Sequence, residues 1–445
     1  MIQNEPILEV GIVSGIELSF HFQYPYRILK GESENHKTFL GTFFANIQNG
    51  QIYFDGQCFQ VLEFEPVTKD NATFEIFNVK IGIDFHWERT EKQVFEGHLK
   101  CIVEGDKITA INKIPLESYL TSVISSEMSA KASAELLKTH AVISRSWLLS
   151  QLEQKGKNSS KNTEFVESET ERICWYDRED HTNYDVCADD HCQRYQGITR
   201  ASTPQVREAI KATRGKVITS DDEICDARFS KCCGGMLEEF QYCWENKPKR
   251  YLIGIPDWDA SHHGNEHPLK VRVDLRIEEN AKAWILGDPP AFCNTSNKDV
   301  LQQVLNDYDQ ETADFYRWSV TYMTSEISQL IYKRSGIDFG EIQELIPLER
   351  GVSGRIVRLK VIGSKRSLII GKELEIRKSL SHSHLYSSAF VVEKTSDGFT
   401  LHGAGWGHGV GLCQIGAAMM SEKGFVYTEI LSHYYPNTIL KELYS

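Results

Sequence analysis

The sequence predicts an α+β protein in which mixed β-rich domains surround a central helical pair, with a helical insertion. Strand-like runs rich in β-branched and aromatic residues fill residues 1–105, and a helical spacing of apolar residues fills residues 114–152. A third observation is the return of helical spacing over residues 297–335. With 445 residues, the chain is long enough for a large core and for two or three domains.

These changes of pattern divide the chain into four segments. Residues 1–105 are expected to form an N-terminal β-rich domain, and residues 106–261 a core that holds the helical pair and a cluster of histidines and cysteines. Residues 262–345 are expected to form a largely helical insertion. Residues 346–445 then supply a C-terminal hairpin and a glycine-rich motif that complete the core.

The composition limits the class of partner. Apolar residues make up 41% and charged residues 25%, and the net charge is −13. This charge argues against nucleic acid or an anionic membrane as the main partner, because both attract basic surfaces. No apolar run approaches the roughly 20 residues of a membrane span. The start, MIQNEPILEVGIVSG, lacks the layout of a signal peptide, which predicts an engineered mature form or a protein that stays in the cytosol.

The N-terminal strands are bounded by turn residues and include ILEVGIVSG, FHFQYPYRIL, QIYFDG and ATFEIFNVKIGI. The segment KITAINKIPL is expected to continue this sheet and to lead into the first helix of the pair. The aromatic residues of these strands favour a packed core over a binding groove.

The helical pair begins at Pro115, which suits a first helical turn. One face of the first helix is apolar and consists of Leu116, Tyr119, Leu120, Val123 and Ile124. That face stops at residues 125–128, and a second helix is expected from the N-cap Ser133, with Glu135 in its first turn. Glu127 therefore lies at the C-terminal end of a helix, where the helix dipole does not favour an anion, and Arg145 lies on the second helix.

Metal-binding residue types gather after a polar loop. His181, Cys187, His191 and Cys192 fall within 12 residues, and sulfur and imidazole ligands suit tetrahedral zinc. The spacing is not a C-x₂-C pair, so reduced buried cysteines beside surface histidines remain the alternative. The 11 cysteines of the chain favour free thiols and one metal cluster over a disulfide framework.

Several local elements are expected after this cluster. Residues 201–214 predict a helix that Gly215 ends, and KVITSDDEIC predicts a hairpin that turns at residues 221–222. Cys232 and Cys233 follow, and because adjacent cysteines rarely pair with each other, they are expected to line a site or to pack tightly. Residues 354–377 alternate apolar and polar side chains and predict a hairpin with its turn at residues 363–364.

The insertion opens on a loop whose side chains allow metal binding, although a solvated loop is the preferred reading; they are His262, His263, Glu266 and His267. Residues 297–335 predict a long helical stretch, with Val300 and Val304 on one side and Trp318 and Tyr322 further on.

Six glycines fall between Gly403 and Gly416. Glycine at this density permits positive φ and a close approach of the backbone to a ligand, while a tight structural turn is the equal alternative. His402, His408 and Gln414 bring polar side chains to this loop. The loop lacks the Lys-Ser/Thr of a phosphate-binding P-loop. From Gln414 a helix is expected, with Gly424 as its cap.

Two stretches resemble one family. PLESYLTSVISSEM…AELLKTHAVISRSW is similar to the core of the SpoIID/LytB family, and GWGHGVGLCQIGA is similar to the motif that closes it. The resemblance covers residues 100–260 and 345–440. It implies peptidoglycan chemistry, either as a lytic transglycosylase that cuts glycan strands or as an amidase enhancer that assists a separate hydrolase. The chain departs from the family pattern at Cys232, Cys233 and Cys413, where many members have serine, and in its insertion.

The resemblance also implies roles for single residues. Glu127 takes the place of the family glutamate, and Arg145, on the second helix, is assigned to substrate or backbone positioning. His402, His408 and Gln414 are expected to bind substrate in the same cleft as Glu127. A structural zinc ion is expected on three of the clustered residues, with His191 in reserve; the three are His181, Cys187 and Cys192.

One carboxylate is enough for a lytic transglycosylase, because the 6-hydroxyl of the muramic acid attacks its own anomeric carbon and leaves a 1,6-anhydro end. A retaining or inverting hydrolase needs a second carboxylate. Such an acid must hold its proton near neutral pH, which burial at the bend favours.

The expected partners are glycan strands and a cell-wall amidase, in the cell envelope or periplasm. A non-catalytic enhancer and a cytosolic zinc-binding protein on the same scaffold remain the alternatives.

Overall fold

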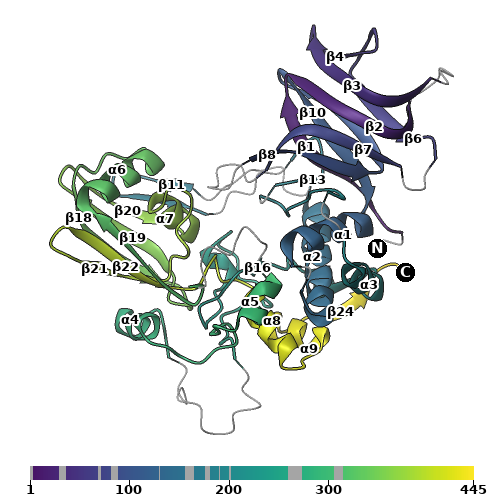
Figure 1. Ribbon diagram of the computed structural model, residues 1–445. Helices are drawn as coiled ribbons and strands as arrows, with labels where there is room; N and C mark the ends of the chain where they lie inside the picture. Colours follow the sequence, from purple (N-terminus) through teal and green to yellow (C-terminus); the bar gives the residue numbers. More distant parts are fainter. Residues whose placement is uncertain are drawn as a thin grey trace. The chain divides into compact units, whose positions relative to one another are not determined.

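The computed structural model describes most of the chain, namely residues 4–29, 37–68, 72–81, 89–129, 131–155, 165–175, 181–189, 191–199, 202–258, 273–304 and 314–445. The fold is α+β, as the sequence predicts. The chain forms two compact units (Figure 1), the first made of Met1–Ala130, Asp180–Lys216 and Glu442–Ser445, the second of Lys131–Glu179 and Val217–Lys441. Within the described ranges, no helix has the length and apolar character needed to cross a membrane.

The first unit is built on a large, mostly antiparallel sheet. Its strand order is β13-β1-β10-β9-β6-β2-β3-β4-β5, and β7 joins β2 to β8. The strands are β1 Ile7–Gly15, β2 Glu17–Ile28, β3 Thr38–Gln48, β4 Gln51–Phe54, β5 Gln57–Phe59, β6 Val61–Pro66, β7 Thr73–Ile81, β8 Arg89–Glu96, β9 His98–Glu104, β10 Lys107–Pro115 and β13 Val186–Cys187. The predicted strand character is confirmed for KITAINKIPL and for the described parts of residues 1–105.

Aromatic side chains fill the core of this sheet. Phe20, Phe22, Phe54 and Phe64 are all buried, and their rings contact one another with centroids 5.0–6.0 Å apart. Rings at these distances gain packing energy beyond the area that they bury. The preference for a core over a binding groove is therefore confirmed for these four residues.

Two helices belong to the first unit. Helix α1 (Leu116–Glu127) follows β10 directly, with Pro115 as its N-cap, and the five apolar residues that the sequence placed on one face are all buried. It ends at Glu127 because Met128 is extended, with φ −111° and ψ 149°. Helix α3 (Pro204–Ala212) begins at the N-cap Thr203, whose side chain accepts from the Val206 N–H, and it packs on α1.

The second unit contains the other predicted helix and the smaller sheets. Helix α2 (Ala134–Gln154) has the predicted N-cap, Ser133, whose hydroxyl accepts the Leu136 N–H. Strands β14 (Lys216–Ser220) and β15 (Glu223–Ile224) form the predicted hairpin, with positive φ at Asp221 and Asp222. The remaining elements are β11 Phe165–Glu167, β12 Glu171–Cys174, β16 Phe229–Ser230, the 3₁₀ helix η1 Phe240–Tyr242, α4 Glu278–Leu286, α5 Lys298–Val304, β17 Arg317–Met323, α6 Thr324–Ser335, β18 Ile342–Arg350, β19 Ile356–Gly363, β20 Ser367–Gly371, α7 Glu373–Ser379, β21 Phe390–Lys394, β22 Gly398–Ala404, β23 Leu412–Cys413, α8 Gln414–Glu422, α9 Tyr427–Tyr434 and β24 Ile439–Glu442.

The predicted long helical stretch over residues 297–335 is wrong at its centre. Residues 317–323 form strand β17, in which Trp318 pairs with Gly403 and Tyr322 with Phe399 of β22. Two residues that are four positions apart share a face in a strand as well as in a helix, so their spacing does not separate the two structures. Hydrogen bonding to β22 makes these residues a strand, and it joins the predicted insertion to the C-terminal segment.

The predicted hairpin over residues 354–377 is confirmed in its first part only. Strands β19 and β20 are antiparallel and turn after Gly363, but residues 373–379 form helix α7. Helices α6 and α7 and the sheets around β19 and β22 share one apolar core, which includes Trp318, Leu359 and Phe390. The chain thus forms two units, and the division into four segments stays a prediction.

Candidate functional site

The clustered histidines and cysteines lie in the first unit, at the edge of its large sheet. Strand β13 pairs in parallel with β1, which places Cys187 opposite Gly11, and the Ala188 N–H donates to the Gly11 carbonyl at 2.9 Å. Tyr184 packs over the same glycine, since a Cβ there would lie 2.6 Å from the tyrosine ring. The His181 ring stacks on Tyr184, with centroids 4.6 Å apart. Contacts with the edge of β1 therefore position both His181 and Cys187.

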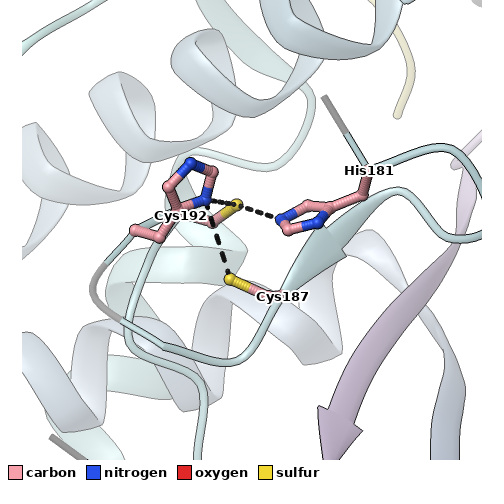
Figure 2. Close-up of side chains that lie close together, drawn as sticks. His181, Cys187 and Cys192 are labelled. Atoms are coloured by element: carbon pink, nitrogen blue, oxygen red, sulfur yellow. Dashed lines mark hydrogen bonds between the residues drawn. The ribbon is translucent and has the colours of Figure 1, made fainter. Parts of the chain in front are cut away.

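A short turn brings the remaining two donors back to Cys187. The Cys192 N–H donates to the Asp189 carbonyl at 3.0 Å, and the Tyr195 N–H donates to the Ala188 carbonyl at 3.0 Å. Figure 2 shows the side chains of His181, Cys187 and Cys192 converging. Because His191 precedes Cys192 directly, the turn carries it into the same group.

The spacing of the donor atoms suits a tetrahedral metal ion. The Cys192 sulfur lies 3.4 Å from His181 Nε2 and 3.4 Å from His191 Nδ1, and the Cys187 sulfur lies 3.9 Å from His191 Nδ1. Zinc bonds of about 2.3 Å to sulfur and about 2.1 Å to nitrogen give tetrahedral edges of roughly 3.4–3.8 Å. All four donor atoms lie within 4.8 Å of one another, so His191 stands with the three predicted ligands.

The electrostatics of the cluster favour the thiolate, which is the form that binds metal. Hydrogen bonding from Cys192, and then from His181 and His191, lowers the pKa of the Cys187 thiol to about 2 against the opposing effect of burial. The residues present therefore fit a zinc ion in both geometry and charge. The presence of the ion stays a prediction.

Glu127 is connected to this cluster by the backbone. It is the last residue of α1 and is half-buried. Its Oε1 accepts the N–H of Arg194 at 3.3 Å, and Arg194 follows Cys192 by two residues. Beneath them, the buried ring of Tyr119 stacks on Tyr195, with centroids 5.0 Å apart. The segment that carries two of the metal donors thus also positions the predicted acid.

The glycine-rich loop lies in the second unit and adopts the backbone that its composition predicts. Gly405, Gly407, Gly409 and Gly411 all have φ between 71° and 93°. Positive φ at every second residue turns the chain tightly and is strained for other residue types. The predicted use of positive φ is confirmed.

A buried arginine holds this loop in place. Arg355 is fully buried, and its guanidinium donates to the carbonyls of Gly407 and Cys233 and to the hydroxyl of Ser353, at 3.0–3.2 Å. A Cβ on Gly409 would overlap the guanidinium carbon, so the loop approaches the arginine only because residue 409 is glycine.

His408 lies within this loop as a neutral imidazole. Burial lowers its pKa well below the ordinary 6.5, and the charges of Arg228, Arg377 and Arg355 lower it further. The Val410 N–H donates to Nδ1 at 3.0 Å, which leaves the proton of the neutral ring on Nε2. The edge of the ring meets Trp244, with centroids 4.5 Å apart.

The other predicted binding residues lie in different surroundings. His402 is on β22, where Nε2 pairs with Glu393 at 2.9 Å, and Gln414 is buried in the first turn of α8. Arg145 is fully buried in α2 and donates to the Ala141 carbonyl at 3.3 Å, a backbone contact within its own helix. Glu127 belongs to the first unit and these residues to the second, so their meeting in one cleft stays a prediction. The histidines of residues 262–267 lie outside the described residues.

Sequence reasoning missed the polar groups behind the loop. Arg355 gave no signal, because a single arginine in a strand-like run is ordinary. Glu238 is fully buried, and burial raises its pKa to about 7, while hydrogen bonds from Ser353 and from the Glu239 N–H oppose the shift. No sequence pattern marked Glu238 either.

Comparisons with known proteins match two parts of the chain. A family model described as Stage II sporulation protein matches residues 104–220, and a model described as a domain of unknown function (DUF8618) matches residues 238–411. The chain is 22% identical to stage II sporulation protein D of Bacillus amyloliquefaciens over 333 residues, which cover 75% of this chain and 76% of that protein. The same protein of Bacillus subtilis is 20% identical over the same shares.

A third relative has a different description. The amidase enhancer of Bacillus subtilis is 24% identical over 234 residues, which cover 52% of this chain and 32% of that protein. Helix α1, Glu127, the His–Cys cluster and α3 all lie inside the residues 104–220 that the family model matches. Residues 104–220 are thus similar to the Stage II sporulation protein family, and the relatives of the chain include sporulation proteins and an amidase enhancer.

Proposed function

We propose that this protein cleaves the glycan strands of peptidoglycan as a lytic transglycosylase, with Glu127 as the acid and then the base. The family supports a role related to the cell wall. The observation that supports lytic transglycosylase activity in particular is the position of Glu127. It is a half-buried carboxyl group at the end of a helix, and its Oε1 accepts a backbone N–H from the His–Cys segment.

The chemistry needs one carboxyl group. Glu127 donates its proton to the glycosidic oxygen as the bond from the muramic acid C1 breaks. The 6-hydroxyl of the same sugar then attacks C1, its proton passes to the Glu127 carboxylate, and the acid is regenerated without water. The Arg194 N–H donates a hydrogen bond to Oε1 and so helps to orient the carboxyl group. The product carries a 1,6-anhydro end.

The His–Cys cluster has a positioning role in this proposal. A zinc ion held by its four donors would be closed to substrate and would supply folding energy. His181, Cys187, His191 and Cys192 would hold the ion, and the segment that they fix carries the Arg194 N–H to Glu127. Loss of the ligands should therefore lower cleavage by displacing the acid, without removing it.

The experiment is digestion of purified glycan strands that lack stem peptides, followed by mass analysis of the ends. The wild-type protein should release 1,6-anhydro ends. Glu127→Gln should reduce cleavage by about 10²–10⁴-fold and keep glycan binding, because the amide preserves the shape but cannot act as an acid. Glu153→Gln, an exposed glutamate near the end of α2, is the matched control and should cut normally.

Two outcomes would contradict the assignment. Cleavage by Glu127→Gln at the wild-type rate would remove Glu127 from the mechanism. Reducing ends in place of anhydro ends would indicate hydrolysis, which requires a second carboxylate.

The amidase-enhancer relative favours one alternative, a glycan-binding protein that assists a separate cell-wall amidase. In that case the wild-type protein binds glycan strands, produces no ends, and raises the rate of an added amidase. Glu127→Gln would then leave the enhancement unchanged.

A further inference from the structure

A second group of metal-binding side chains lies in the interior of the second unit, apart from the His–Cys cluster. It consists of Cys233, Asp257, Cys293 and Cys413, whose ligand atoms all lie within 4.8 Å of one another. Each of the four is at most 2% exposed. The sulfur atoms of Cys233 and Cys293 are 3.5 Å apart. Three thiols and a carboxyl group from four separate segments thus meet at one buried point.

The backbone around this point brings the four segments together. Strand β16 pairs in parallel with β23, with Ser230 opposite Cys413, and β16 leads within three residues to Cys233. Gly234 and Gly235 then turn the chain with φ of 80° and 100°, and the Asp257 N–H donates to the Gly235 carbonyl at 3.1 Å. The fourth segment joins through Asp257, whose Oδ2 accepts the Cys293 N–H at 3.0 Å.

The surroundings of Cys413 and Asp257 favour the negatively charged forms of these two donors. The Cys233 N–H donates to the Cys413 sulfur at 3.2 Å, and Cys413 stands at the N-cap of α8, where the helix dipole stabilises a thiolate. The Tyr434 hydroxyl donates to Asp257 Oδ1 at 2.6 Å. Hydrogen bonds of this kind orient the ligands of metal sites and hold their charge.

Glycine at position 416 makes room for the carboxyl group. A Cβ on Gly416 would lie 2.7 Å from Asp257 Oδ1 and 2.8 Å from Oδ2. The carboxyl group therefore reaches the first turn of α8, beside Cys413, only because residue 416 has no side chain.

We propose that Cys233, Asp257, Cys293 and Cys413 bind a second, structural zinc ion. Zinc–sulfur bonds of about 2.3 Å give a tetrahedral edge of about 3.8 Å, close to the sulfur separation found here. Thiolates select soft ions such as zinc, and a carboxylate is an accepted fourth ligand. Four protein donors leave no open position, which assigns the ion to structure: it joins β16, β23 and the segments of Asp257 and Cys293 behind the glycine-rich loop.

A disulfide is the competing explanation for the short sulfur separation. Disulfide bonds among the cysteines at this point would leave the buried carboxyl group of Asp257 without a role, and all of these cysteines are free thiols. The metal site accounts for all four donors. Cys232, whose thiol contacts the sulfurs of Cys293 and Cys413, lies beside the group.

The test counts metal in the full-length protein purified without chelator. Elemental analysis should find two zinc ions per chain. Cys187→Ser with Cys192→Ser should lower the count to one, and so should Cys293→Ala with Cys413→Ala, while the four changes together should abolish zinc. Cys243→Ala removes a buried thiol outside both groups and should keep two. One zinc per chain in the wild type, lost with Cys187 and Cys192, overturns the proposal.

A second measurement needs no substitution at the site and so survives a variant that fails to fold. In the wild-type protein loaded with cobalt(II), near-ultraviolet charge-transfer absorption rises with the number of bound thiolates. The intensity should match the two thiolates of the first cluster together with the three of the second. An intensity for two thiolates alone, or an intact mass after alkylation that shows an oxidised cysteine pair, would also overturn it.

Discussion

Replacing Gly409 with alanine tests how firmly the glycine-rich loop is held. Gly409 has φ +76°, a conformation that costs an L residue about 1–2 kcal/mol. The new Cβ would also overlap the guanidinium carbon of Arg355 and lie 2.7 Å from its Nη2. The guanidinium cannot swing away freely, because it is buried and donates hydrogen bonds to three acceptors. Overpacking of this kind costs about 1–3 kcal/mol, which gives a total of about 2–5 kcal/mol.

The matched control is Gly424→Ala in the same unit. Gly424 has φ +90°, and a Cβ built there meets nothing within 4 Å, so this variant experiences only the backbone strain. Urea unfolding followed by tryptophan fluorescence should show that Gly409→Ala loses about 1–3 kcal/mol more than Gly424→Ala. Equal stability of the two variants would refute the idea that Arg355 holds the loop, because the clash is the only term that separates them.

Two further predictions concern buried polar groups. Burial lowers the pKa of His140 from 6.5 to about 3, and neither ring nitrogen has a hydrogen-bond partner among the described residues. Folding therefore disfavours the protonated ring, and the free energy of unfolding of the second unit should fall by about 1.4 kcal/mol per pH unit between about pH 6.5 and pH 3. His140→Leu should remove this part of the loss in acid unfolding curves. An unchanged pH dependence of the variant would contradict the prediction. Inside the first unit, the Tyr195 hydroxyl donates to Asn112 Oδ1 at 2.5 Å. Tyr195→Phe should therefore lower the free energy of unfolding in urea by about 1–3 kcal/mol. An unchanged free energy would show that the bond contributes nothing to stability.

Local patterns predicted the helical pair well because each signal acts over a few residues. Pro115 and Ser133 mark helix starts through their own backbone and side-chain groups, and the structure places both at N-caps. The alternating glycines of the loop likewise predict their own φ values. Cys187 and Cys192 lie close in sequence, so their meeting with His181 needed only a short turn.

The rest depends on contacts between distant residues. Trp318 and Tyr322 lie on a strand because β22, about 80 residues later, pairs with them. Cys233 and Cys413 were each noticed, but only the pairing of β16 with β23 brings them together, across a sequence separation of 180 residues. No local pattern marked Asp257 or Cys293 as a metal ligand. The role of Arg355 could be recognised only from the folded loop, whose carbonyl groups accept its hydrogen bonds.

The division of the chain into units has a consequence for its synthesis. The first unit draws on residues on both sides of α2, and it is completed by the last four residues: the Leu443 N–H donates to Gly215, and the Tyr444 hydroxyl donates to the buried Glu117. A ribosome that has released β10 has therefore made most of the large sheet but neither β13 nor the tail. Because synthesis proceeds at roughly 5–20 residues per second, the edge of β1 stays unpaired with β13 for several seconds or more. A chain interrupted just before Glu442 would leave the helix that bears the proposed acid without its hydrogen bond from Tyr444.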